Sequence, residues 1–248
     1  MLGAALDIFS KEGFAFLSRW AHVVVGITWI GLLYYFNFVQ VPAFGEMEAA
    51  ARNNAIDKLA SRALWWFRWA AVATVATGLL ILGFQEQLND MKYFKTGSGI
   101  AIATGILFGL TMFVNVWGII WRNQKVVIAN ARNVQAGGEA DPAAAGAGRV
   151  ALLASRQNTI FSLPMLVFMV GASHFPYDRL DLAGSKRGIY WAITGVVWIV
   201  FELNALGKLG GTAPGGSRII YDTHQNAIIT GLCYAVFSII VFGFVLAA

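Results

Sequence analysis

The chain has 248 residues, of which 58% are apolar and only 12% carry a charge. A soluble domain is about 45–50% apolar and about 25% charged, so this composition excludes a water-soluble globular fold and indicates an integral membrane protein. The formal net charge is +5, but the basic residues are spread between apolar blocks. That pattern is typical of membrane flanks, so we expect a lipid bilayer as partner and no nucleic acid.

Apolar blocks along the chain predict an all-α fold, a polytopic membrane helical bundle of about six transmembrane helices. We treat residues 1–248 as a single integral membrane domain. The predicted spans lie near residues 20–44, 64–84, 97–121, 158–177, 188–206 and 219–248. Residues 123–157 are expected to form a cytoplasmic hairpin whose Ala/Gly-rich tip, residues 136–148, is flexible. The spacing of Ala101, Gly105 and Gly109 predicts close helix packing.

Lysine and arginine are distributed unequally over the connections between these spans. The loops after the first, third and fifth spans carry 11 of them, against 7 in the remaining connections. Positive residues are retained on the cytoplasmic side. We therefore expect those three loops in the cytoplasm and both termini on the opposite side, in the periplasm if the membrane is a bacterial inner membrane.

Two of the three histidines are predicted to lie at the same depth, near the outer face. His22 is close to the outer end of the first span and His174 is close to the outer end of the fourth. Two imidazoles from different helices can bind a haem axially or hold a metal ion, and they can also act as an acid–base pair. The alternative is that each histidine hydrogen-bonds a neighbour at the level of the lipid headgroups.

A second polar cluster is predicted on the cytoplasmic side from Glu202, Asp222 and His224. Charged groups inside a membrane span are costly and are candidates for function. Glu202 is expected either to pair with a cation, from Arg68, Arg122, Lys208 or His224, or to serve in a proton relay. Asn37 and Asn115 are interpreted as hydrogen-bonding residues between helices.

Three long segments carry a resemblance to one family. They are RWAHVVVGITWIGLLYYFNF (residues 19–38), FVNVWGIIWRNQKVV (residues 113–127) and SRQNTIFSLPMLVFMVGASHFP (residues 155–176). Together they resemble the membrane domain of bacterial cytochrome-c-coupled urate hydroxylases, the urate oxidase N-terminal domain family. The motif positions carried over are His22, Asn115, Trp117, Asn123, Gln124, Arg156, Asn158, Thr159, Ser162, Pro164 and His174. Arg122 departs from the family pattern, which has proline at that place.

The resemblance implies a redox enzyme of the bacterial inner membrane that hydroxylates urate and passes electrons to a cytochrome c. Haem b or a metal ion bound by His22 and His174 is the expected cofactor. The single cysteine, Cys233, excludes a CxxCH haem-attachment site, so the electron acceptor is expected to be another protein. The alternative hypothesis is a non-catalytic accessory subunit of a larger membrane oxidoreductase complex. A small transporter, suggested by Glu202 and the proline at position 164, ranks last.

Overall fold

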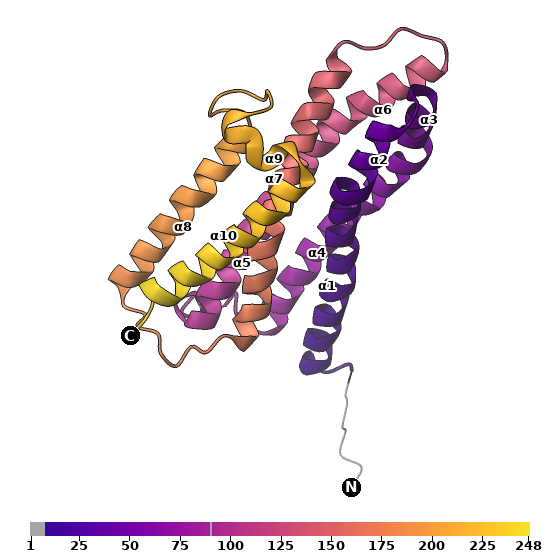
Figure 1. The fold of residues 1–248 in the computed structure, drawn as a ribbon. Helices are drawn as coiled ribbons and strands as arrows, with labels where there is room; N and C mark the ends of the chain where they lie inside the picture. The colour runs from indigo at the N-terminus through magenta and orange to yellow at the C-terminus, as the bar shows by residue number, and fades with distance from the viewer. Residues whose placement is uncertain (1–7, 90) are drawn as a thin grey trace.

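The computed structural model describes residues 8–89 and 91–248, and within them the chain is helical, with no β-strand. The long helices lie side by side as a bundle (Figure 1). The predicted all-α fold class is therefore confirmed. The α-helices are α1 (Lys11–Tyr34), α2 (Val41–Glu46), α3 (Ala49–Ala55), α4 (Ser61–Phe84), α5 (Gly97–Val114), α6 (Trp121–Gln135), α7 (Ala143–His174), α8 (Gly184–Ala205), α9 (Ile219–Asp222) and α10 (His224–Val245).

Three π-helical segments continue these helices without a break, so that several α-helices join into longer rods. They are η1 (Tyr35–Gln40), η2 (Ile56–Ala60) and η4 (Asn115–Ile120). Short 3₁₀ turns, η3 (Tyr93–Lys95) and η5 (Gly216–Arg218), precede α5 and α9. A π-helical turn accommodates one extra residue and rotates the side chains that follow it, and such turns are frequent at functional sites.

Side-chain caps fix where the long helices begin. Ser10 accepts a hydrogen bond from the backbone N–H of Gly13, Thr96 from that of Gly99, and Thr223 from that of Asn226. Each cap satisfies one of the backbone donors that a helix start leaves free. The cap at Thr223 also separates α9 from α10, so the predicted last span, residues 219–248, is two helices rather than one.

Five continuous helices are long and apolar enough to cross a membrane, in the part of the chain that the structure describes. They are Lys11–Glu46, Ala49–Phe84, Gly97–Gln135, Gly184–Ala205 and His224–Val245. The first three extend well beyond the predicted spans, because hydropathy marks only the apolar part of a helix whose backbone hydrogen bonds continue past it. The fourth predicted span, residues 158–177, overlaps the second half of α7 and runs three residues past its end at His174; α7 is not one of these five helices.

The segment between residues 123 and 157 is more ordered than the sequence suggested. α6 continues to Gln135 and α7 begins at Ala143, so the connecting turn is confined to residues 136–142. The prediction of a flexible tip over residues 136–148 is wrong in its second half. Alanine is the strongest helix former, and the alanine run after Pro142 starts a helix instead of a linker.

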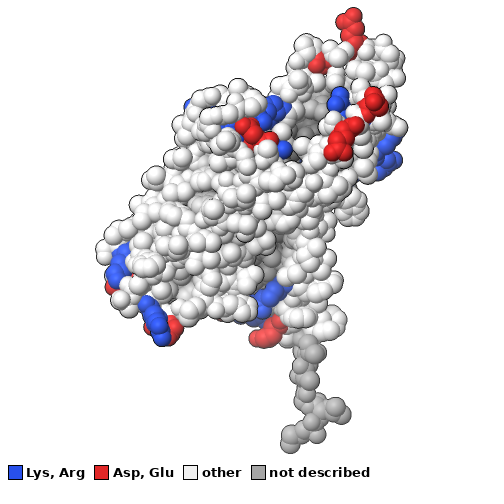
Figure 2. Space-filling model, in the orientation of Figure 1, with Lys and Arg blue, Asp and Glu red and all other residues white. Residues whose placement is uncertain are grey.

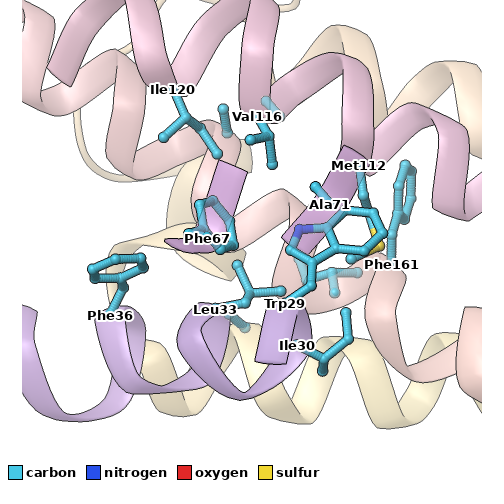
Figure 3. Close-up of a cluster of buried hydrophobic side chains, with 14 of the residues drawn as sticks. Trp29, Ile30, Leu33, Phe36, Phe67, Ala71, Met112, Val116, Ile120 and Phe161 are labelled. Atoms are coloured by element: carbon cyan, nitrogen blue, oxygen red, sulfur yellow. The ribbon is translucent and has the colours of Figure 1, made fainter. Parts of the chain in front are cut away.

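The interior is built from apolar side chains of several helices. Trp29, Leu33, Phe67, Met112 and Phe161 meet in one buried cluster (Figure 3). Close packing of α5 on α7, predicted from the small residues of α5, is confirmed: a Cβ at Gly105 would lie 3.2 Å from the side chain of Met169. α7 therefore runs through the protein interior, in contact with α1, α5, α6 and α10.

On the face that Figure 2 shows, charged side chains gather at the two ends of the bundle and leave an uncharged band across its middle. Large apolar side chains such as Val196, Ile229 and Val236 are exposed on α8 and α10. An exposed apolar surface flanked by charged ends is what a bilayer requires. α1 begins and α10 ends at the same end of the bundle (Figure 1).

Candidate functional site

A buried polar stripe on α7 is the main concentration of polar side chains in the interior. Its members are at most 5% exposed: Arg156, Gln157, Asn158, Thr159 and Ser162. Buried polar groups are costly unless they are hydrogen-bonded. Their hydrogen-bond partners come from several different helices, so these side chains join α7 to its neighbours.

Towards α1, two hydrogen bonds join the stripe to the first span. Asn37 in η1 donates to the Ser155 hydroxyl at 2.8 Å, and the hydroxyls of Tyr34 and Ser162 are 2.8 Å apart. The Oδ1 atom of Asn37 is buried and has no hydrogen-bond partner among the described residues. The prediction that Asn37 links helices is confirmed.

Towards the third span, Asn115 and Asn158 connect α7 to η4 and α8. The Asn115 amide donates to Oδ1 of Asn158 at 3.0 Å and to Oε2 of Glu202 at 3.4 Å. Asn158 donates in turn to the Met112 carbonyl at 3.0 Å. Since Asn115 is the first residue of η4, the π-helical turn directs its side chain between α7 and α8. Asn115 therefore also links helices, as predicted.

The predicted cluster of Glu202, Asp222 and His224 is not a single site in this structure. Glu202 is held by Asn115, and no cation forms an ion pair with it within residues 8–89 and 91–248. Asp222 instead pairs with Arg149 at 2.8 Å and accepts the backbone N–H of Gly215 at 2.8 Å. His224 begins α10, where its ring lies 6.2 Å from that of Phe38. The break at Thr223 separates His224 from Asp222 and places them on different helices.

Asp222 lies outside the five helices that are long and apolar enough to cross a membrane, and its environment favours the charged form. Partial burial alone would raise the pKa of the carboxyl, but the hydrogen bonds from Arg149 and Gly215 outweigh it and hold the pKa below its usual value. The preceding residue of α9, Tyr221, donates to Oε1 of Gln157 at 2.7 Å, and Arg156 donates to the Tyr221 carbonyl. α9 is thereby fixed to the polar stripe.

His22 and His174 lie at the same level of the bundle but on different surfaces. α1 and α7 run in opposite directions and meet at Tyr34 and Ser162 (Figure 1). Each histidine is 12 residues from that contact, which is about 18 Å along either helix. The His22 ring packs against Thr74, Thr77 and Gly78 of α4, whereas His174 is exposed at the end of α7.

Each imidazole nevertheless has one ring nitrogen engaged and one available. Nδ1 of His22 is 2.9 Å from the Thr74 carbonyl, and Nδ1 of His174 is 2.9 Å from the Val170 carbonyl. A carbonyl partner fixes the proton on Nδ1 and leaves Nε2 as the ligating atom, the usual arrangement at haem and metal sites. No group of three or more potential metal-binding side chains occurs among the described residues, and ligation of a haem or metal ion by His22 and His174 stays a prediction.

A cavity of about 170 Å³ is lined by residues of η1, α2, α4, η4, α6 and α7. Its walls are largely apolar, with Phe36 and Phe67 in edge-to-face contact at 5.4 Å between ring centroids. Three polar side chains also line it: Gln40, Gln124 and Ser155. The Oε1 atom of Gln40 is buried and has no hydrogen-bond partner in the described residues. An apolar cavity with a few polar groups is the usual form of a small-molecule site.

Comparison with known families identifies the middle of the chain. Residues 87–200 match the urate oxidase N-terminal family. This match agrees with the resemblance predicted from residues 113–127 and 155–176, and it supports a urate-oxidase-related domain in that part of the chain. Comparison with curated proteins and with solved structures gives no match.

The range that matches the urate oxidase N-terminal family includes Asn115, Gln124, Asn158 and His174. The matched range does not include His22 or Gln40, which precede it, or Glu202, Asp222 and His224, which follow it. Sequence reasoning selected Gln124 through its motif and did not select Gln40 or Phe67. Their place in a cavity depends on how α1 and α4 pack against α6, and no spacing within one helix indicates that.

Proposed function

We propose that this protein is an integral membrane oxidoreductase that hydroxylates urate or a closely related oxidised purine. The observation that carries the proposal is that the urate oxidase N-terminal match coincides with the buried polar stripe of α7 and its partner Asn115. Polar groups at this depth are expensive in a membrane protein and mark functional sites. The uncharged band of Figure 2 and the five apolar helices support the membrane location.

The cavity beside the stripe is the proposed substrate site. Urate is a flat heterocycle whose rim carries both N–H donors and carbonyl acceptors. Side-chain amides of Gln40 and Gln124 can both donate and accept, and Phe36 and Phe67 supply apolar surface for the ring faces. A cavity of about 170 Å³ suits one small heterocycle rather than a drug-sized ligand.

The proposed reaction balances as a two-electron oxidation. Water supplies the hydroxyl oxygen that forms the new carbon–oxygen bond, and two protons leave the reacting molecules for solvent. Two electrons leave the purine and pass one at a time to a c-type cytochrome, which is reduced. In this proposal the chain's own residues bind and orient the purine.

Purified full-length protein in lipid nanodiscs tests the proposal. We expect urate to disappear, by its ultraviolet absorbance, with the reduction of two ferricytochrome c per urate. Gln124→Leu should lower kcat/KM by about tenfold through the loss of a hydrogen bond to the substrate. Gln135→Leu, at the exposed end of the same helix, is the matched control and should leave it unchanged.

Folded protein that neither consumes urate nor reduces the cytochrome would contradict the enzymatic proposal. If that inactive protein co-purified in stoichiometric amount with a larger membrane redox enzyme, the accessory-subunit hypothesis would be supported instead.

His22 and His174 remain the candidate ligands of a haem or metal ion within this proposal, since each directs a free Nε2 away from its backbone contact. Bound haem would supply one-electron chemistry between the purine and the cytochrome. Absorbance spectra before and after dithionite should then show a Soret band that is altered in His22→Ala and His174→Ala and unaltered in His224→Ala. Absence of the band in active protein would exclude haem.

A further inference from the structure

Arg68 is a buried cation that has no acidic partner in the part of the chain that the structure describes. It lies on α4 and is 8% exposed, and its Nε and Nη1 atoms have no hydrogen-bond partner among the described residues. Its guanidinium carbon lies 3.3 Å from the centre of the Trp121 ring and 5.6 Å from that of Trp117. Aromatic faces attract a cation but leave its N–H groups without acceptors.

A second cation lies close to the same indole. Nζ of Lys125 is 5.9 Å from the centre of the Trp121 ring, so one aromatic ring contacts two positive side chains. No carboxylate pairs with either cation in residues 8–89 and 91–248. Asp57, the acid on η2, already pairs with Lys58 and Arg132. The local charge is therefore positive and uncompensated.

The surrounding aromatic residues indicate the depth of this cluster. Trp65, Trp66 and Trp69 flank Arg68 on α4 and are 49%, 60% and 47% exposed. Tryptophan concentrates at the level of lipid headgroups, where one side of the ring is apolar and the other is hydrated. The Nε1 atom of Trp117 is also buried without an acceptor, which adds a third unsatisfied donor to those of Arg68.

We propose that Arg68, Trp117, Trp121 and Lys125 form a binding site for the phosphate group of an anionic phospholipid. A phosphodiester provides several acceptor oxygens for the unsatisfied N–H donors of Arg68 and Trp117. It also provides a negative charge to balance the two cations, Arg68 and Lys125. The acyl chains would then lie along the exposed apolar surface of α4. Basic pockets between membrane helices commonly bind such headgroups. The site requires the membrane location proposed above but not the urate chemistry, so failure of one does not imply failure of the other.

Native mass spectrometry of the delipidated full-length protein, titrated with defined lipids in detergent, tests this site. We expect cardiolipin or phosphatidylglycerol to bind at least tenfold more tightly than phosphatidylcholine. Arg68→Gln should weaken binding of the anionic lipid about tenfold, the effect of losing one charge-assisted hydrogen-bonding group. The matched control, Arg62→Gln, removes an equal charge from the exposed surface of the same helix and should change affinity less than about twofold.

Lys125→Gln provides a second test if Arg68→Gln does not fold. It should weaken the binding of anionic lipid and leave the binding of phosphatidylcholine unchanged. Equal affinities of the wild-type protein for anionic lipid and phosphatidylcholine would overturn the proposal. So would equal losses in the Arg68 and Arg62 variants. Displacement of the lipid by equimolar inorganic phosphate would show that the site binds a free anion and would overturn the lipid assignment.

Discussion

Asn158 illustrates how single side chains hold this interior together. It accepts from Asn115 and donates to the Met112 carbonyl, so one amide satisfies two groups of the third span from within α7. Both the residue and Asn115 are at most 1% exposed, and water does not reach them. Loss of this amide would remove the donor to the Met112 carbonyl and leave Asn115 with only its longer hydrogen bond to Glu202.

We predict that Asn158→Ala lowers the free energy of unfolding by about 2–4 kcal/mol, because a buried group left unsatisfied costs about 1–3 kcal/mol and a small void is added. Thermal unfolding in detergent measures the change. Asn123→Ala is the control, since Asn123 donates only to Ile119 on its own turn. Equal melting temperatures for the two variants would contradict the role assigned to Asn158.

Asp222 gives a prediction with a defined pH dependence. Burial raises the pKa of Asp222, but the hydrogen bonds from Arg149 and Gly215 together lower it by more than burial raises it. The pKa in the folded state therefore lies below the pKa in the unfolded state. A depressed acid stabilises the fold at pH values above the unfolded pKa, and this contribution is lost as the pH falls through the folded pKa. Asp222→Asn should therefore lower the melting temperature at pH 7, and the difference from wild type should shrink as the pH falls below about 4.

The control for this measurement is Asp178→Asn, an exposed acid on the α7–α8 connection. It should leave the melting temperature nearly unchanged at both pH values. A deficit in Asp222→Asn that stays constant from pH 7 to pH 3 would show that the carboxylate charge is not what stabilises α9.

At the scale of elements, close contact between α10 and α7 depends on a single glycine. A Cβ placed on Gly231 would lie 2.9 Å from Leu163 Cδ1 and 3.1 Å from the carbonyl oxygen of Ile160. The side chain could turn away, but the backbone oxygen belongs to a packed helix and cannot. Small residues at such crossings allow helices to approach closely in membranes.

We predict opposite effects for two equal substitutions in α10. Gly231→Ala should destabilise the protein by about 1–3 kcal/mol through overpacking against α7. Gly243→Ala meets no atom within 4 Å and should be neutral or stabilise by up to about 1 kcal/mol, since alanine is the better helix former. Chemical unfolding in mixed micelles compares them; a stabilised Gly231→Ala would contradict the close approach.

Much of the element order could be predicted because apolar blocks, caps and prolines are local signals. The remainder depends on contacts between helices. The carboxyl of Glu202 bonds to Asn115, 87 residues away, and no spacing within either helix indicates that pairing. The equal depth of His22 and His174 followed from sequence position, whereas their orientation towards different surfaces depends on how α1 packs on α4. The start of α7 was missed because alanine-rich sequence suits both a linker and a helix.

At the scale of the whole molecule, the uncharged band of Figure 2 defines which surface positions tolerate a charge. Val196 is 62% exposed in the middle of α8, and Ile219 is 59% exposed in α9 at one end of the bundle. We predict that Val196→Lys disfavours membrane insertion by about 2.5–3.5 kcal/mol, whereas Ile219→Lys has little effect. The fraction of each variant that resists alkaline extraction from membranes measures this, and equal fractions would contradict the assigned band.

The polar stripe of α7 has a consequence for the order in which the protein is assembled. Five helices are long and apolar enough to cross a bilayer individually. In contrast, α7 exposes Arg156, Gln157 and Asn158 until neighbouring helices cover them. During synthesis α5 and α6 leave the ribosome before α7, and α9 and α10 leave after it. α9 and α10 follow α7 in the chain, and Tyr221 of α9 donates to Gln157 of the stripe, so the stripe acquires its full set of partners only after these later helices have been made.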